Sequence, residues 1–169
     1  FNDFYYNENA EKQIYEYSEE DGLNLNIWAP EKGENLPVAV FVHGGSFVSG
    51  SNTSPNIFRG VDYCRRGIIL VNINYRLNAF ATGYDKTHHG NYALKDQVAA
   101  LTWVRENIAA FGGDPERVTL MGESAGALSV QLLMYCPYAK GLFRGAVMMS
   151  GGGDLSALGT PNRPVRIRP

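Results

Sequence analysis

The sequence predicts an α/β fold in which a mostly parallel sheet is flanked by helices. Continuous apolar runs, typical of strands buried on both faces of a parallel sheet, occupy residues 38–42, 68–73 and 118–121. A shorter run at 145–150 extends the series. Helical segments separate these runs, and strands that alternate with helices favour parallel pairing through right-handed crossovers. A chain of 169 residues is long enough for one domain with a core.

Local patterns predict the elements of the first half. Apolar and polar residues alternate over 23–29, which indicates a half-buried strand. A polar turn then leads into the strand at 38–42, and a loop rich in Gly and Ser follows that strand. Residues 56–66 are expected to form a helix that Gly67 ends.

The second half contains the longest predicted helix. We expect an irregular loop over 76–90 before it. Apolar residues then recur every three or four positions, as in an amphipathic helix; they are Leu94, Val98, Leu101, Val104 and Ile108. The sequence FGGDP ends this helix in a turn, and a further helix is expected after the strand at 118–121. We expect residues 1–150 to form one incomplete domain and the Gly/Pro-rich stretch 151–169 to be an irregular tail.

Charge and composition exclude several classes of protein. A net charge of -2 gives no electrostatic reason to expect nucleic acid as a partner. No apolar run approaches the roughly 18 residues of a membrane span. Cys64 and Cys136 have no Cys or His neighbour at metal-ligand spacing, so no metal site is expected. The two cysteines could form one disulfide; we favour two unpaired, buried thiols.

The cellular compartment stays open. Unpaired thiols favour a reducing compartment such as the cytoplasm. The polar and aromatic N-terminus is not a signal peptide. The chain starts at Phe1 without an initiator methionine, so we expect a processed, truncated or partial sequence, and secretion after signal cleavage remains an alternative.

The strongest chemical signal is the sequence Gly122-Glu123-Ser124-Ala125-Gly126. It lies between a buried strand and an apolar helix, which is the setting of a nucleophile elbow. In such a turn the serine backbone is strained, and Gly122 and Gly126 allow strand and helix to approach closely. The turn presents the Ser124 hydroxyl at the carboxyl edge of the sheet, beside a helix N-terminus that favours negative charge. Ser124 is the candidate nucleophile; a plain Gly/Ser turn is the alternative.

A second motif, His43-Gly44-Gly45, follows the buried strand 38–42. Acyl transfer requires N–H donors aimed at the oxygen that becomes an oxyanion. The residue after the nucleophile supplies one donor, here Ala125, and a glycine-rich loop after an earlier strand supplies the others. We therefore expect Gly44, Gly45 and Ala125 to form an oxyanion hole, with an ordinary loop as the alternative.

Longer segments around both motifs resemble the type-B carboxylesterases, the family that includes bacterial para-nitrobenzyl esterases and the cholinesterases. FGGDPERVTLMGESAG, residues 111–126, resembles the serine-site signature of that family. Residues 43–51, 74–77 and 90–115 are also similar to family segments, and the resemblance extends over 17–150. Hormone-sensitive-lipase-like esterases share the glycine loop and the elbow, but the long helical stretch argues against them.

The resemblance implies an α/β-hydrolase fold and hydrolysis of a small-molecule carboxylic ester through a Ser124 acyl-enzyme. It implies no metal or organic cofactor. Glu123 would be a buried supporting residue, not the acid of the catalytic triad, and Ser129 would also support the site. The sequence departs from the family at Gly22, where the second family signature has a Cys that usually joins a disulfide. Its absence agrees with unpaired thiols.

The general base and its orienting acid are missing. In this fold an Asp or Glu and then a His follow the serine, yet the residues after Ser124 contain no His and a single carboxylate, Asp154. We assign His43 to the oxyanion loop and expect His88 and His89 to be solvated. The missing remainder of a longer chain is the partner we expect to supply base and acid. A split enzyme, a short protein without catalysis, and a non-catalytic binding protein of the same fold are the alternatives.

Other side chains have less specific expectations. Asp96 and Arg105 on the long helix, and Arg76 after a strand, are expected to provide a buried ion pair that holds helix to sheet. Phe47 either lines the acyl pocket or packs in the core. Trp103 is expected in the core rather than as a platform for substrate.

Overall fold

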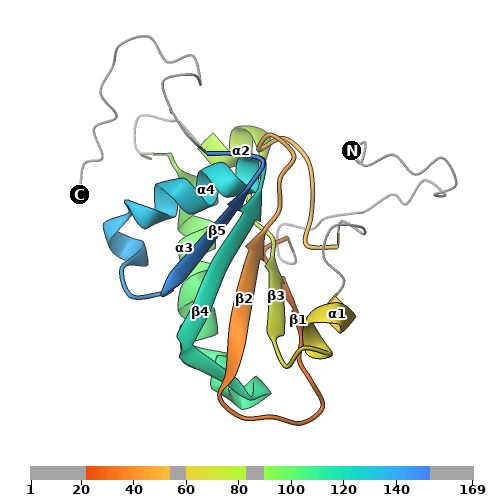
Figure 1. The fold of residues 1–169 in the computed structure, drawn as a ribbon. Coiled ribbons are helices and arrows are strands. Elements are labelled where there is room, and N and C mark those ends of the chain that lie inside the picture. Colours follow the sequence, from red (N-terminus) through yellow and green to blue (C-terminus); the bar gives the residue numbers. More distant parts are fainter. Residues whose placement is uncertain (1–21, 54–59, 83–89, 153–169) are drawn as a thin grey trace, which may run out of the picture.

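The computed structural model describes residues 22–53, 60–82 and 90–152. Within these ranges, one sheet has the strand order β1-β3-β2-β4-β5 (Figure 1). β1 is antiparallel to β3, and every other neighbouring pair is parallel. This arrangement confirms the predicted α/β class with a mostly parallel sheet. The strands are β1 Leu25–Trp28, β2 Leu36–Val42, β3 Ile69–Ile73, β4 Gly113–Glu123 and β5 Gly145–Met149.

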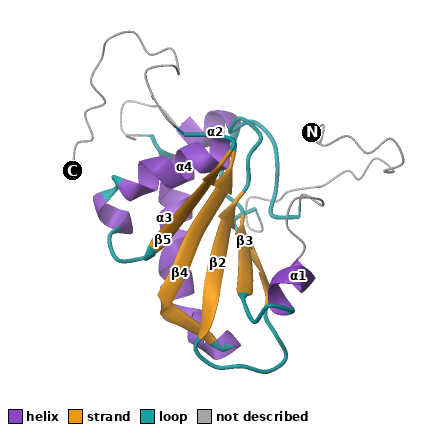
Figure 2. Cartoon of the chain, viewed as in Figure 1, coloured by secondary structure: helices purple, strands orange, loops and turns teal. Residues whose placement is uncertain are grey.

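Helices pack on both faces of the sheet (Figure 2). α3 and α4 cover one face, where they contact β2 and β4, and α1 lies on the opposite face beside β1 and β3. The helices are α1 Gly60–Cys64, α2 Asn78–Thr82, α3 Tyr92–Asn107 and α4 Ala125–Met134, with short 3-10 helices η1 Ile108–Phe111 and η2 Pro137–Ala139. No described helix combines the length and apolar composition needed to cross a membrane.

Alternate strand residues supply two apolar clusters. Val38, Val40 and Val42 face the larger cluster, with side chains of α3 and α4. Ala39 and Phe41 point the other way, into a smaller cluster with Trp28 and Tyr63. All five β3 residues are buried, as the continuous apolar run predicts. Full burial of one such aliphatic side chain stabilises the fold by about 1.5–3 kcal/mol, so the central strands form a rigid base for the loops that follow them.

Several boundaries differ from the sequence predictions. The expected loop over 76–90 contains α2, whose single turn is too short to show helical periodicity. The turn predicted at FGGDP is partly wrong, because β4 already begins at Gly113. Leu36 pairs with Gly113 and Val38 with Val118. Over this stretch β4 therefore has more residues than β2, and the register between the two strands is irregular. Gly67, at φ 69°, donates its N–H to the Cys64 carbonyl oxygen (3.0 Å) and ends the turn after α1.

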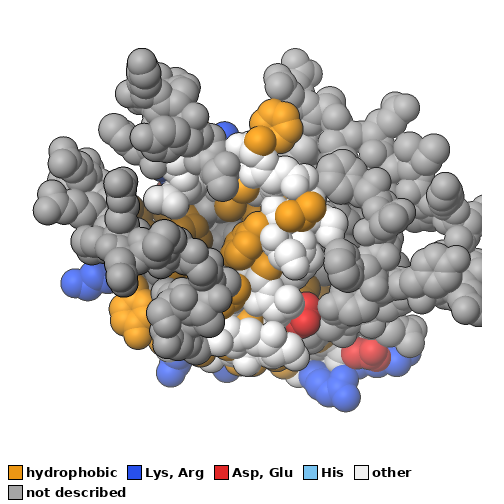
Figure 3. Space-filling model, turned by 90° about the horizontal axis from the view of Figure 1, so that it is seen from above, with side chains coloured by type: hydrophobic (Ala, Val, Ile, Leu, Met, Phe, Trp, Pro, Cys, Tyr) orange, Lys and Arg blue, Asp and Glu red, His pale blue; other side chains and the backbone are white. Residues whose placement is uncertain are grey.

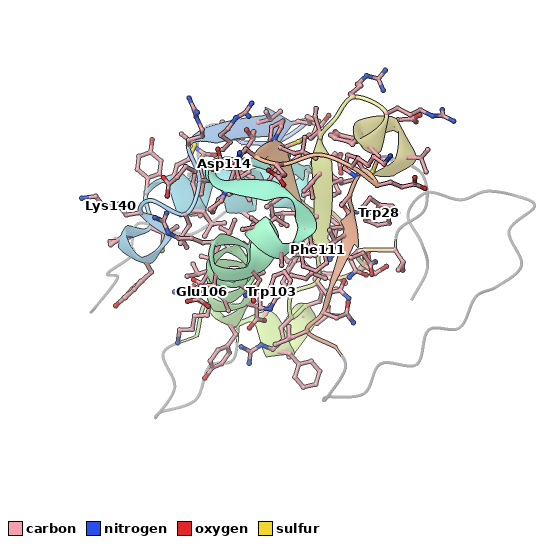
Figure 4. The ribbon with its side chains drawn as sticks, turned by 90° about the horizontal axis from the view of Figure 1, so that it is seen from below. Trp28, Trp103, Glu106, Phe111, Asp114 and Lys140 are labelled. Carbon is pink, nitrogen blue, oxygen red and sulfur yellow. The ribbon has the colours of Figure 1, made fainter. Side chains whose placement is uncertain are left out.

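Two expectations for charged and aromatic side chains need correction. Trp103 is 36% exposed, because it is two positions from the buried Leu101 and therefore about 200° around the helix. Its ring lies near Phe111, with centroids 6.2 Å apart (Figure 4). Arg105 does not join the buried ion pair; it bonds Glu116 at the surface (3.0 Å).

The expected ion pair forms between Arg76 and Asp96, but it is buried only on the Asp96 side, because the Arg76 side chain is 39% exposed. The Arg76 guanidinium donates from Nε and Nη2 to the two Asp96 carboxylate oxygens, at 2.8 and 2.6 Å. The Asp96 side chain is only 5% exposed. Because Asp96 belongs to α3 and Arg76 follows β3, this pair holds the helix to the sheet.

The two cysteines do not form a disulfide. Cys64 and Cys136 are free, as favoured from the sequence, and are partly rather than fully buried.

β5 pairs with β4 on one side, and no described strand pairs with its other edge. Val147 and Met148 are consequently 40% and 44% exposed. The expectations for residues 1–21, 54–59, 153–169, His88 and His89 lie outside the described residues.

Candidate active site

The register between β2 and β4 brings the two sequence motifs together. Val42, the last residue of β2, pairs with Gly122. Gly44 and Ser124 each follow two residues later, so both lie just beyond the carboxyl ends of the neighbouring strands β2 and β4, whose arrangement Figure 1 shows. A side-chain carbon placed on Gly44 would lie 3.1 Å from Ser124 Cβ and 2.6 Å from a Glu123 carboxylate oxygen. The glycine loop and the serine turn are therefore in direct contact.

Ser124 has the strained backbone of a sharp strand-to-helix turn. Its φ is 52° and its ψ is −117°, a combination that costs a non-glycine residue about 1–3 kcal/mol. The Ser124 N–H donates to the Met149 carbonyl oxygen (2.9 Å), and the Ser124 carbonyl accepts from the Leu128 N–H (3.1 Å). These bonds fix the turn between β5 and the first turn of α4, and they leave Ser124 partly exposed.

Gly122 and Gly126 occupy positions that exclude any side chain. A Cβ on Gly122 would collide with the backbone of Gly126, and a Cβ on Gly126 would collide with the carbonyl oxygen of Val42. The crossing of β4, α4 and the end of β2 is thus close enough to require glycine at both positions. This close approach is what sets the direction in which Ser124 leaves the sheet.

The loop after β2 turns tightly just beyond its glycines. The Gly45 carbonyl oxygen accepts hydrogen bonds from the Val48 and Ser49 N–H groups, at 2.9 and 3.0 Å. Gly45, Ser46 and Phe47 have φ values of 99°, 57° and 59°. The Phe47 side chain is partly buried and packs against the larger core cluster, which is one of its two expected roles.

His43 is held inside this loop. It is 4% exposed, its Nδ1 bonds the Gly44 carbonyl oxygen at 2.8 Å, and its ring stacks on Tyr75 with centroids 4.4 Å apart. Its Nε2 has no hydrogen-bond partner among the described residues. Burial lowers the pKa of His43 to about 4, and the bond to Gly44 opposes that shift only partly. The imidazole is therefore neutral at pH 7, with its proton on Nδ1 because a carbonyl only accepts.

The remaining expected site residues lie around this contact. Ala125 is the first residue of α4 and is 3% exposed. Glu123 is half-buried, less than expected, with its carboxylate beside Gly44. Ser129 is fully buried and accepts a hydrogen bond from Gln97 Nε2 (3.1 Å), which joins α4 to α3.

Few charged side chains reach the centre of the site face. Seen from above, the described surface has hydrophobic side chains and Asp or Glu atoms among uncharged atoms, with Lys and Arg at its periphery (Figure 3). The described residues contain no group of three or more His, Cys, Asp or Glu side chains that could hold a metal ion. The described functional groups nearest to Gly44 are the Ser124 side chain, the Glu123 carboxylate and the backbone of the turn.

Buried asparagines hold the far end of the loop, and sequence analysis missed them. The Asn52 N–H donates to Asn74 Oδ1 (2.7 Å), and Asn52 Nδ2 donates to Asn24 Oδ1 (2.6 Å). Asn72 Nδ2 donates to the Asn52 carbonyl oxygen (3.3 Å). A signal was available at Asn72, because an amide within an apolar strand is costly unless it is hydrogen-bonded.

Known proteins with a similar sequence or fold include esterases and a lipase. A model of the carboxylesterase family matches residues 2–166. The para-nitrobenzyl esterase of Bacillus subtilis (strain 168) is 46% identical over 138 residues, 78% of this chain and 28% of that protein. The bile salt-activated lipase of Mus musculus is 45% identical over 147 residues, 80% of this chain and 24% of that protein. The crystal structure of a Geobacillus stearothermophilus carboxylesterase matches with a TM-score of 0.73 and 47% identity, covering 80% of this chain and 30% of that one.

The chain spans 24% to 30% of the length of these three proteins. Over that span the identity is above 40%, and two solved para-nitrobenzyl esterase structures match with TM-scores of 0.74 and 0.76. The predicted α/β-hydrolase fold is therefore confirmed for the part present here. The chain belongs to the carboxylesterase family.

Proposed function

We propose that this chain carries the nucleophile and the oxyanion hole of a serine hydrolase that cleaves small-molecule carboxylic esters. Ser124 is the nucleophile, and the N–H groups of Gly44, Gly45 and Ala125 are the oxyanion donors. The observation that supports this most strongly is the contact between the strained Ser124 turn and Gly44. Two motifs far apart in the sequence meet at one point of the sheet edge, as acyl transfer requires.

The proposed reaction has two halves. Ser124 Oγ attacks the ester carbonyl carbon, its proton passes to a general base, and the carbonyl electron pair becomes a tetrahedral oxyanion. The alcohol then leaves with the proton from the base, and the acyl group stays on Ser124. Water repeats the attack and releases the acid. Each oxyanion donor strengthens its hydrogen bond as charge develops, and loss of one donor typically lowers kcat by about 10²–10³.

The base and its acid are proposed to come from outside these 169 residues. No histidine follows Ser124 in the sequence. His43 is a poor candidate, because its Nδ1 is engaged by Gly44 and its pKa is about 4. The open edge of β5 offers a place where further strands would pair and cover Val147 and Met148. The remainder of its own chain is thus the proposed partner, and residues 1–169 alone are proposed to be inactive.

The face around Ser124 supports an uncharged substrate. Hydrophobic and uncharged atoms make up most of the described site face, and the charged group beside Gly44 is the Glu123 carboxylate, which would repel an anionic substrate (Figure 3). A small ester can desolvate against such a surface at little cost, whereas a charged substrate would need a paired side chain. The related proteins are themselves named esterases and lipases, which supports the same substrate class.

Hydrolysis of a para-nitrophenyl ester tests this proposal. The protein translated from the complete reading frame that contains these codons is expected to release nitrophenolate, and Ser124→Ala should lower kcat at least about 10³-fold. Thr102→Ala is the matched control: it removes a hydroxyl that bonds the Val98 carbonyl on α3 (2.9 Å), and it should leave kcat unchanged.

Two outcomes would contradict the proposal. Equal rates for the parent and Ser124→Ala would remove Ser124 from the mechanism. A folded full-length protein with no turnover of short-chain or longer-chain esters would instead support a non-catalytic binding protein of this fold. Residues 1–169 alone should show no rate above their own Ser124→Ala variant.

A further inference from the structure

The oxyanion loop is held by the segment that follows β3. Tyr75 lies two residues beyond the end of β3 and is 4% exposed. Its hydroxyl donates to the carbonyl oxygen of His43 (2.7 Å). Its ring stacks on the His43 imidazole, with an interplanar angle of 20°, and meets Phe47 edge-on with centroids 6.5 Å apart. One buried side chain thus contacts the loop on both sides of Gly44 and Gly45.

Peptide geometry gives these contacts a specific consequence. A peptide unit is planar and trans, so its C=O and N–H groups point in opposite directions. The His43 carbonyl shares a peptide plane with the Gly44 N–H. The hydrogen bond from the Tyr75 hydroxyl to that carbonyl therefore also sets the direction of the Gly44 N–H.

The same reasoning applies to the next peptide. The Gly44 carbonyl shares a plane with the Gly45 N–H, and His43 Nδ1 donates to that carbonyl at 2.8 Å. Burial keeps His43 neutral at pH 7, so the donor proton stays on Nδ1 and Nε2 needs none. The peptide units on either side of Gly44 can rotate easily, because glycine has no side chain. Each of the two is held by one hydrogen bond to its carbonyl oxygen.

We propose that Tyr75 and His43 are positioning residues that orient the Gly44 and Gly45 N–H groups toward the oxyanion, Tyr75 through the His43 carbonyl and His43 through the Gly44 carbonyl. Neither side chain touches the substrate. The inference rests on the proposed function, since it gives a role to residues that act on the oxyanion donors. Removal of either hydrogen bond should therefore lower kcat and leave KM nearly unchanged, because the donors act mainly when the oxyanion forms.

Tyr75→Phe isolates the first hydrogen bond in the full-length protein. The substitution keeps the ring that stacks on His43 and removes only the hydroxyl. We expect kcat to fall about tenfold with KM within about twofold, since small errors in donor position are costly. Tyr63→Phe is the matched control: its hydroxyl lies 4.0 Å from Met121 Sδ, in the cluster on the opposite face, and kcat should not change.

Two His43 variants separate orientation from packing. His43→Phe keeps an aromatic ring against Tyr75 and loses the donor to Gly44. His43→Asn keeps an amide donor near the Nδ1 position and loses the ring. If His43 orients Gly45, kcat is higher in His43→Asn than in His43→Phe by about tenfold, while thermal stability follows the opposite order. A purely structural role would give the same order for kcat and for stability.

A trifluoromethyl ketone provides a second measurement of the oxyanion donors. Ser124 Oγ adds to its carbonyl carbon, the base takes the serine proton, and the carbonyl electron pair becomes an oxyanion that mimics the transition state. The inhibition constant should rise in Tyr75→Phe by the factor that kcat falls. An unmodified parent that neither hydrolyses esters nor binds the ketone would refute the proposed function itself. An active parent with kcat and inhibition constant unchanged in both Tyr75→Phe and His43→Phe would refute only this inference.

Discussion

Replacing Ser124 by glycine is expected to stabilise the protein while it removes the nucleophile. At φ 52° and ψ −117° a non-glycine residue stores about 1–3 kcal/mol, which glycine does not. Glycine also increases the conformational entropy of the unfolded chain, which offsets this gain in stability by about 0.5–1 kcal/mol. The free energy of unfolding of Ser124→Gly should therefore exceed that of Ser124→Ala by about 1 kcal/mol, because alanine keeps the strain.

Urea unfolding of both variants measures this difference. Gly67→Ala provides the calibration, since Gly67 has φ 69° and a Cβ there would meet no atom within 4 Å. That variant should lose about 1 kcal/mol through backbone conformation alone. If Ser124→Gly is no more stable than Ser124→Ala while Gly67→Ala shows the expected loss, the Ser124 turn is not strained and the account of the elbow is wrong.

Two further predictions concern buried polar groups. Asp96→Ala should lower the free energy of unfolding by about 2 kcal/mol, since it leaves Arg76 without its bidentate partner, whereas Glu116→Ala at the exposed pair with Arg105 should change it by less than about 0.5 kcal/mol. Similar losses in urea unfolding would contradict the difference in burial. His43 has a folded pKa of about 4, below its unfolded value of 6.5, so the unfolded chain binds more protons between these pH values. Stability should therefore rise by up to about 3 kcal/mol from pH 4 to 6.5 and then level off, and His43→Phe should lack this component; an equal pH dependence in both proteins would refute the assignment.

The sheet could be predicted from sequence because its central strands are buried on both faces. The apolar runs that contain Val40 and Val71 are short and apolar throughout, which favours strands buried on both faces of a sheet. Their parallel pairing follows from the alternation of strands and helices along the chain. The same holds for the turn at Ser124, since its flanking glycines lie between a buried strand and an apolar helix. These features depend on local sequence and on the burial of whole elements.

Surface features were predicted less well, because each depends on the rest of the fold. Trp103 lies about 200° around α3 from the buried Leu101, so the helical period itself would have placed it off the buried face; the prediction of a core position relied on its apolar ring. Arg105 and Asp96 share a helix, yet only Asp96 faces Arg76, which depends on how α3 packs on the sheet. Exposure of Val147 follows from the position of β5 at the sheet edge.

The support of the oxyanion loop was not predictable from its own residues. Tyr75 and Asn74 follow β3, and only the parallel pairing of β3 with β2 brings them to His43 and Asn52. A sequence pattern shows that polar residues follow a buried strand, but it does not show which loop they meet. The residues that orient the donors are therefore found only from the structure.

Labelling with a fluorophosphonate tests the central claim, that Ser124 is an activated nucleophile, most directly. The full-length protein is treated with the probe, digested, and the modified residue is located by mass spectrometry. We predict one adduct, on Ser124, which is lost in Ser124→Ala and absent from residues 1–169 alone, where the base is missing. An adduct on another serine, or a folded full-length protein without any adduct, would contradict the account.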